Sequence, residues 1–197
     1  MNQKRNQGYQ RTHESIQDYL YQRLEKKSIR QITVGEICTA VEINRSTFYA
    51  HFKDVYEVME SIFDKLNEEL MVRCASFAEK RNEESGSHMS RRDYMIILLE
   101  YMREHRHFYM ILLEDSANPM VVNSMRRLRE GIADPVFHHY EVDERTANYC
   151  FAFVISGFFA VMHAWLKEGC IETPEEIADI MENIQPKLPN GDVMEFF

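Results

Sequence analysis

Apolar residues recur at intervals of three and four along most of this chain, which is the spacing of one face of an α-helix. The clearest example is the apolar side of 54–81, formed by Val55, Val58, Met59, Ile62, Phe63, Leu66 and Leu70. The pattern predicts about nine helices: 12–27, one from about Thr33, 46–51, 54–81, 91–103, 108–115, 119–140, 143–169, and one from Thr173 that ends before Pro186. We expect a polar, basic arm at 1–10 and a polar loop at 82–90.

Residue types that favour helix starts support these boundaries. Thr33 is followed three residues later by Glu36, which is the pattern of a capping box. Asp54 is placed to cap the long helix that follows it, and Pro119 suits a first helical turn. The run Thr173-Pro174-Glu175-Glu176 combines a cap, a proline and acids at the positive end of the helix dipole.

Composition favours the same fold class. Hydrophobic residues make up 45% of the 197 residues, which is enough for a substantial core, while Gly (7) and Pro (5) are scarce and Met (12) is plentiful. We therefore predict an all-α protein with two domains. A small three-helix domain with an N-terminal arm covers 1–53, and a larger helical domain covers 54–197.

Charge is distributed unevenly between these two parts. The formal net charge is −9, which argues against indiscriminate binding to nucleic acid. Residues 1–53 nevertheless hold nine Lys and Arg against five Asp and Glu, while residues 54–197 hold fourteen against twenty-seven. A basic head on an acidic body is typical of a protein that contacts phosphates with one end only.

Several other classes of site lack support in the sequence. Cys38, Cys74, Cys150 and Cys170 are scattered without Cys-x-x-Cys spacing, which favours reduced thiols in a cytoplasm over disulfides or a zinc site. The pairs His105/His107 and His138/His139 match metal ligands only faintly, so we expect no metal. There is no glycine-rich phosphate loop and no supported nucleophilic triad, so we expect neither a cofactor nor an enzyme.

Two further features concern membranes and export. The first residues, MNQKRNQGYQR, lack the apolar core of a signal peptide. The apolar run 150–166 has seventeen residues and includes His163, so a buried core helix is favoured over a membrane span. We expect a cytoplasmic protein without a membrane partner; a membrane-associated helical protein is the alternative.

The stretch 32–52 predicts two short helices around a tight turn, the layout of a helix-turn-helix. Cys38 supplies the small side chain where the helices cross, Ile43 fills the space beneath the turn, and Phe48 anchors the second helix. Such a turn usually contains a glycine, because its φ is often positive. Here the position holds Glu42, at an expected cost of about 1 kcal/mol.

The exposed start of the second helix carries side chains that suit DNA recognition. Arginine can fork onto guanine in the major groove, and short hydroxyls can meet bases or phosphates. A helix start such as that at Thr33 can hold a phosphate. The predicted DNA contacts are Thr33, Asn44, Arg45, Ser46, Thr47, Tyr49, His51 and Lys53. The alternative is a short helical hairpin that only belongs to a core.

The sequence TVGEICTAVEINRSTFYAHFKD resembles the N-terminal module of the TetR family of bacterial transcriptional regulators, in which a helix-turn-helix ends in a Thr/Ser-Phe/Leu-Tyr-x-His-Phe run. Residues 47–52 match this run closely, and GFFAVMHAWLKEGCIETPEEIA (157–178) resembles the last two helices of one TetR subgroup. The resemblance implies an all-α homodimer on a palindromic DNA site. It assigns DNA contacts to Thr33, Ser46, Thr47, Tyr49, His51 and Lys53, with Arg45 contacting bases. Two positions depart from the family pattern: Glu42 in the turn, and Val55 where a lysine is common.

The larger domain is expected to provide dimerisation and regulation. We predict a four-helix interface between two copies, formed by Phe151, Phe158, Met162, Trp165, Ile177, Ile180, Met181 and Ile184. A pocket for a small apolar ligand is predicted from Met102, Tyr109, Leu113, Met125, Phe137, Met162 and His163. In both cases the alternative is an ordinary internal core.

Added to these features, the resemblance implies a homodimeric, sequence-specific repressor that a small ligand releases from a palindromic operator. Two alternatives remain within the same family: a ligand-independent activator, and a DNA-binding protein regulated by a protein partner. A helical enzyme without a DNA role is the alternative from a different class.

Overall fold

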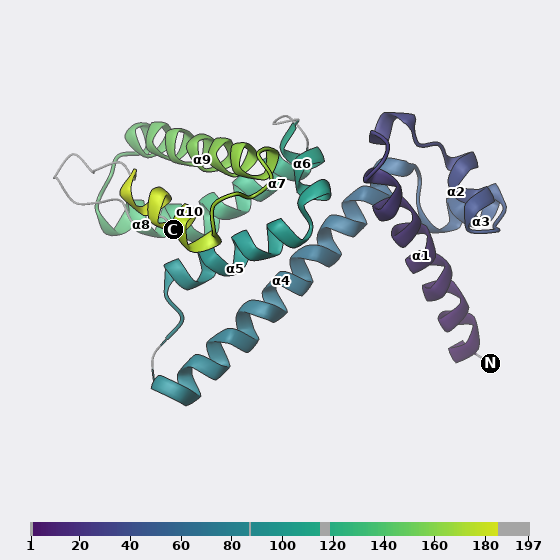
Figure 1. Cartoon of the computed structure of the whole chain (residues 1–197), viewed down its shortest axis with the longest axis horizontal. Helices are drawn as coiled ribbons and strands as arrows, with labels where there is room; N and C mark the ends of the chain where they lie inside the picture. Colours follow the sequence, from purple (N-terminus) through teal and green to yellow (C-terminus); the bar gives the residue numbers. More distant parts are fainter. Residues whose placement is uncertain (1, 87, 115–118, 185–197) are drawn as a thin grey trace. The chain divides into compact units, whose positions relative to one another are not determined.

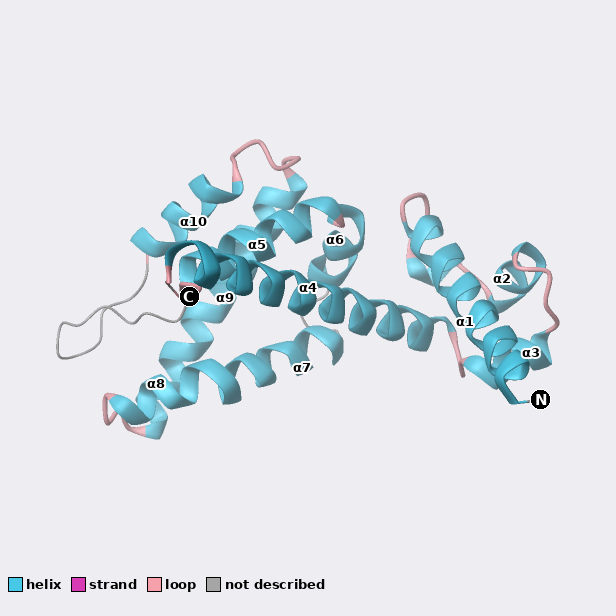
Figure 2. Ribbon diagram, turned by 90° about the horizontal axis from the view of Figure 1, so that it is seen from below, coloured by secondary structure: helices cyan, strands magenta, loops and turns pink. Residues whose placement is uncertain are grey.

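The computed structural model of this chain describes residues 2–86, 88–114 and 119–184 (Figure 1). Within these ranges the chain forms α-helices and no β-strand, which confirms the predicted all-α class (Figure 2). The helices are α1 (Asn2–Leu24), α2 (Val34–Ala40), α3 (Arg45–His51), α4 (Val55–Ser85), α5 (Arg91–Glu104), α6 (Arg106–Glu114), α7 (Pro119–Leu128), α8 (Asp134–His139), α9 (Glu144–Lys167) and α10 (Pro174–Asn183).

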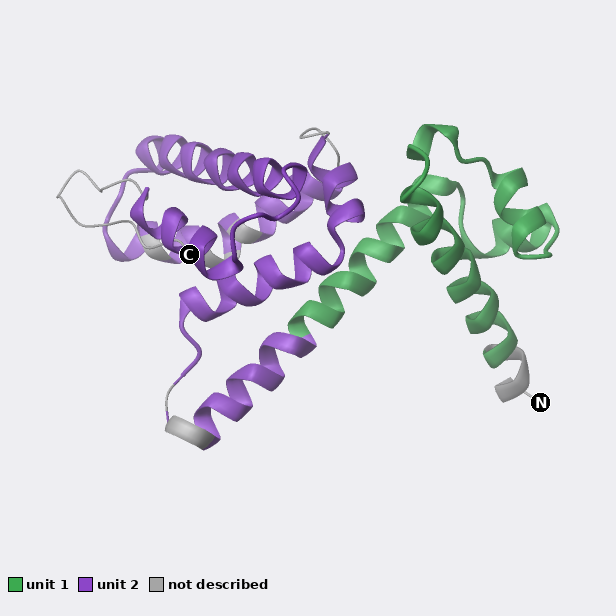
Figure 3. Ribbon diagram, viewed as in Figure 1, with its two compact units in different colours: residues 1–71 green, residues 72–197 purple. Residues whose placement is uncertain are grey.

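The chain divides into two compact units, residues 1–71 and 72–197 (Figure 3). This division lies inside α4. The sequence analysis placed the domain boundary between residues 53 and 54, just before α4 begins. The first half of α4 contributes buried side chains to the N-terminal unit, among them Val58, Met59, Ile62 and Leu66. α4 thus supplies residues to both units.

Several helix boundaries differ from the prediction. The segment expected to be an arm is helical from Asn2, and α4 continues to Ser85 into the expected loop. At Thr33 only half of the predicted capping box forms: its side chain accepts from the backbone N–H of Glu36, but the Glu36 carboxylate binds elsewhere. At Thr173 the predicted box forms completely, with Pro174 in the first turn.

The helix predicted over 119–140 is interrupted. Between α7 and α8 the residues Arg129–Ala133 form a π-helical turn. Pro135 explains the interruption, because it has no N–H to donate to the carbonyl of Gly131 four residues earlier, and an α-helix cannot continue unchanged past that position. The described part of the chain therefore has one α-helix more than the nine that periodicity predicted.

The core of the N-terminal unit is formed by α1, α2, α3 and the start of α4. Ile16, Leu20, Ile37 and Phe48 are completely buried there. Gln17 of α1 is also buried, and its side-chain amide donates to the Ser61 hydroxyl of α4. Because a buried amide needs a partner, this bond favours one register of α1 against α4.

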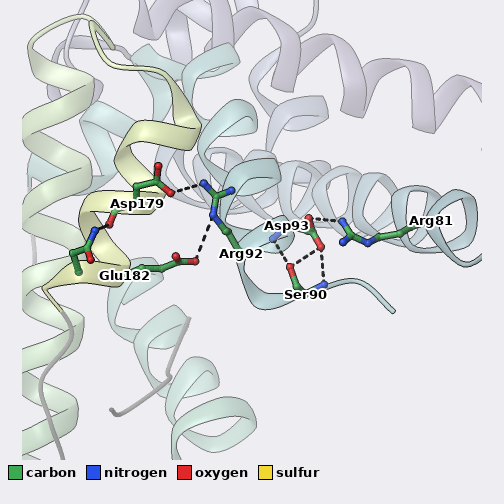
Figure 4. A network of polar contacts seen from close by, with 7 residues as sticks. Arg81, Ser90, Arg92, Asp93, Asp179 and Glu182 are labelled. Atoms are coloured by element: carbon green, nitrogen blue, oxygen red, sulfur yellow. Dashed lines mark hydrogen bonds and ion pairs between the residues drawn. The ribbon is translucent and has the colours of Figure 1, made fainter. Parts of the chain in front are cut away.

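In the C-terminal unit α5 packs against α10, and α6 packs against α9. Arg92 of α5 pairs with Asp179 and, at 3.7 Å, with Glu182 of α10, as Figure 4 shows. The Arg106 guanidinium of α6 donates to the carbonyls of Leu166 and Lys167 at the end of α9. The Leu166 carbonyl also accepts from the Gly169 N–H at 3.2 Å. The guanidinium adds a donor for the Lys167 carbonyl and places positive charge at the negative end of the helix.

α9 is the most apolar helix, and only part of it is covered. In the described residues it is the one helix that is long and apolar enough to cross a membrane, a property that core helices of soluble proteins share. One third of its most apolar window is buried inside the chain. An apolar surface therefore remains open along α9.

The turn between α2 and α3 has the strain that the sequence predicted. Glu42 has a φ of +57°, in the left-handed region where a Cβ is unfavourable. The backbone N–H of Ile43 donates to the Cys38 carbonyl at 3.0 Å, which fixes the turn.

Replacing Glu42 by glycine is expected to raise the free energy of unfolding by about 1 kcal/mol relative to Glu42→Ala, because only glycine removes the Cβ. Chemical denaturation of the full chain measures the difference. Glu42→Ala is the control, since it removes the carboxylate but keeps the strain. Equal stability of the two variants would contradict this account of the turn.

Candidate nucleic-acid interface

The two short helices α2 and α3 are fixed by caps at their starts. The Thr33 hydroxyl accepts from the Glu36 N–H at 3.1 Å. The side-chain oxygen of Asn44 accepts from the Thr47 N–H at 2.7 Å, and from the hydroxyls of Ser46 and Thr47 at 2.6 and 2.9 Å. Asn44 is therefore the cap of α3, a role that the sequence analysis missed although Asn is a preferred cap residue.

The buried side of α3 is formed by Phe48. Its side chain is completely buried, and its ring meets that of Tyr49 edge-on at a centroid distance of 5.6 Å. Ile37 and Cys38 of α2 are also buried, as the helix-turn-helix prediction requires. With Phe48 inside, the polar residues at the start of α3 are left outside.

Most of the predicted DNA contacts lie on the surface. Thr33, Asn44, Arg45, Ser46 and Lys53 are exposed, and 56% of Tyr49 is exposed. Thr47 and His51 are partly buried.

Arg45 and Thr33 approach the same point of α2. A Cβ placed on Gly35 would lie 3.4 Å from Arg45 Nη2 and 3.9 Å from Thr33 Oγ1. The absence of a side chain at Gly35 therefore leaves space for the guanidinium beside the start of α2. The structure thus places the forked donor of Arg45 on α3 and the hydroxyl of Thr33, the cap of α2, near the same glycine.

Glu36 connects α2 to α1. Its Oε1 accepts from Arg23 Nε at 2.6 Å, from Lys27 Nζ at 3.2 Å and from the Tyr19 hydroxyl at 3.2 Å. The hydrogen bond from Arg23, followed by that from Lys27, lowers the pKa of the Glu36 carboxyl. The carboxylate holds the first helix of the motif against the helix that supports it.

Replacing Glu36 by glutamine is expected to lower the melting temperature at pH 7. A carboxyl with a lowered pKa stabilises the fold above its unfolded pKa, and this contribution is lost as the pH falls through the folded pKa. The difference between wild type and Glu36→Gln should therefore shrink below about pH 4. Asp18→Asn, at an exposed position of α1, is the control. A difference that does not change with pH would contradict the ionic role.

The start of α4 explains one departure from the family pattern. Val55 is only 7% exposed, so its side chain is part of the core and cannot contact a phosphate. The Asp54 carboxylate accepts from the Glu57 N–H at 2.9 Å, and the Glu57 carboxylate accepts from the Lys53 N–H. The backbone at Lys53 is thereby fixed while its ammonium side chain stays exposed.

The predicted ligand-binding residues all lie on helices of the C-terminal unit, from α5 to α9. Met102, Tyr109, Phe137 and Met162 are buried, and Leu113, Met125 and His163 are partly buried. Phe137 packs in a cluster with Ala133 and Ala147, against Phe151 in the first half of α9. Met162 lies about 16 Å further along that helix, at 1.5 Å per residue.

The predicted dimerisation residues differ in their exposure to solvent. Five are buried inside the single chain: Phe158, Met162, Trp165, Ile177 and Met181. Phe151 is partly buried, whereas Ile180 and Ile184 are 45% and 59% exposed.

The opposite side of α9, which the sequence analysis did not select, is open. Its exposed residues are Tyr149, Ala152, Phe153, Ser156, Gly157, Ala160 and Ala164. Their spacing of three and four forms one continuous stripe. Tyr149 and Phe153 are each 68% exposed, and a Cβ on Gly157 would meet nothing within 4 Å.

Comparisons with known proteins agree with this architecture. Residues 91–187 match a TetR family model described as "Transcriptional regulator C-terminal region". Fourteen chains of solved structures match. One is the "Dihydroxyacetone kinase operon activator DhaS", with a TM-score of 0.51, 18% identity, and coverage of 88% of this chain and 93% of that one. The comparison with curated protein sequences gave no match.

Proposed function

We propose a homodimeric repressor function for this chain, which belongs to the TetR family of DNA-binding transcriptional regulators. In this proposal residues 1–53 bind a palindromic operator, residues 54–197 dimerise and bind a small ligand, and the protein acts in the cytoplasm. The observation that carries the proposal is the exposed, polar start of α3, where Arg45 approaches Gly35 of α2, as Thr33 does.

DNA contacts follow from the geometry of α3. Arg45 is at the first position of the helix, and its five donors suit the two acceptors of guanine in the major groove. The exposed Tyr49 and Lys53 follow along the same segment and are assigned to phosphates, as is Thr33 at the start of α2. The hydroxyls of Ser46 and Thr47 already donate to Asn44, so they are left to act as acceptors for base amino groups.

A second copy of the chain is the proposed partner of the open side of α9. One short recognition helix binds DNA weakly, so two half-sites are normally needed. The small residues Gly157, Ala160 and Ala164 would allow two α9 helices to approach closely, and Phe153 and Tyr149 provide apolar area. The exposed Ile180 of α10 and the exposed Ile184, which follows the end of that helix, would extend this interface.

A small apolar ligand is the proposed signal. Met102, Tyr109, Leu113, Met125, Phe137, Met162 and His163 supply adaptable side chains in the C-terminal unit. To release DNA, the ligand must bind the DNA-incompetent state more tightly by about 1–3 kcal/mol or more. α4 contributes residues to both units and is the proposed route of coupling. DhaS is described as an operon activator. An activator role is the second candidate for this chain, and a reporter gene placed under the operator separates repression from activation.

Arg45→Ala is expected to weaken binding by about 1–3 kcal/mol per half-site, because each bidentate contact to guanine contributes that much discrimination. Arg45→Lys should keep most of the salt dependence and lose sequence discrimination, since lysine retains the charge but not the fork. Electrophoretic shift on the DNA upstream of the chain's own coding sequence measures both. Arg127→Ala, at an exposed position of α7, is the control. Unchanged binding of both Arg45 variants would contradict the assignment.

Phe153→Glu is expected to convert the dimer to a monomer, with a loss of at least about 2 kcal/mol in association, because it places a charge in the centre of an apolar interface. Size-exclusion chromatography with light scattering gives the mass directly. Val122→Glu is the matched control, since Val122 is an exposed apolar residue on α7. A dimeric Phe153→Glu variant would contradict the proposed interface.

A further inference from the structure

The side chain of Tyr9 contacts the C-terminal end of α3. Tyr9 belongs to the part of α1 that the sequence analysis took for an arm. The Tyr9 ring stacks on the His51 ring at a centroid distance of 3.9 Å, with 28° between the planes. The Tyr9 hydroxyl donates to the Ala50 carbonyl at 3.3 Å. The last carbonyls of an α-helix have no intrahelical donor, so this bond satisfies one that α3 cannot satisfy itself.

His13, one helical turn after Tyr9, continues the stack. Its ring lies on Phe52 at 4.3 Å and is 5.7 Å from the ring of His51. The rings therefore follow one another in the order Tyr9, His51, His13 and Phe52, so that residues of α1 alternate with residues at the end of α3. Contacts between rings at these distances fix the orientation of each ring.

The environment of His51 also determines which ring nitrogen donates. Nδ1 of His51 is buried without a hydrogen-bond partner. Burial lowers the pKa of His51, and the neighbouring His13 lowers it further, so the ring is neutral near pH 7. A neutral imidazole has one N–H. A proton on Nδ1 would be a buried donor without an acceptor, which is costly, so Nε2 carries it.

We propose that Tyr9 is a positioning residue for DNA binding: by stacking on His51 and bonding the Ala50 carbonyl, it holds His51 so that Nε2–H donates to a DNA phosphate. This inference rests on the proposed DNA-binding function. It makes the first turns of α1 part of the DNA-binding surface, although Tyr9 itself does not contact the DNA.

The test uses the full chain and the duplex that the wild-type protein shifts. Tyr9→Ala is expected to weaken binding about tenfold and to reduce the slope of log K against log salt by about 1 per half-site, because one phosphate contact is lost. Tyr9→Phe keeps the stack and should retain most of the affinity and the full slope. Tyr140→Ala is the matched control, since Tyr140 is 40% exposed and its ring meets His139 edge-on.

A double-mutant cycle separates positioning from mere support of the fold. If Tyr9 acts through His51, the effect of Tyr9→Ala on affinity and slope should nearly disappear in a His51→Ala background. Circular dichroism confirms that each variant is folded at the temperature of the assay. An unchanged slope in Tyr9→Ala, or additive effects of the two substitutions, would overturn the inference. If the wild-type chain shifts no duplex, the proposed function itself fails.

Discussion

The burial of Phe48 is the interaction on which the proposed DNA-binding surface depends. Isolated helices shorter than about 12–15 residues are marginal in water, and α3 has seven residues. Its stability therefore comes from contacts outside itself. Phe48 is completely buried, Asn44 caps the start, and the Tyr9 hydroxyl satisfies a carbonyl at the end. With one side and both ends fixed, the remaining side presents Arg45 and its polar neighbours in a defined geometry.

Charge in the N-terminal unit is used in two ways. Arg23 and Lys27 are bound by Glu36 and hold α1 to α2, so they serve the fold. The exposed Arg45 begins α3, the exposed Lys53 follows its end, and both are assigned to DNA in the proposed function. This division explains how a chain with a net charge of −9 can still present a basic surface.

The sequence predicted local features well and distant ones poorly. The cap at Thr173, the anchor Phe48 and the strained Glu42 are each signalled by the residue types of their immediate sequence neighbours. The structure confirms all three. The stack of Tyr9 on His51 joins residues 42 positions apart, and no periodic pattern signals such a contact. Pro135 did signal the interruption of the helix predicted over 119–140, but the prediction followed the helical spacing of the apolar residues alone. For α9 the outward side could not be selected, because a helix that is apolar on several faces does not reveal which one is covered.

Selection of duplex DNA from a random-sequence pool tests the central claim most directly, namely that two copies of α3 bind a two-fold symmetric site. The account predicts an enriched inverted repeat whose half-sites are separated by about one helical turn of DNA, or a multiple of it. Native mass spectrometry of the selected complex should show an even number of chains on each duplex. A pool without any enriched sequence, or a single half-site bound by one chain, would contradict the account.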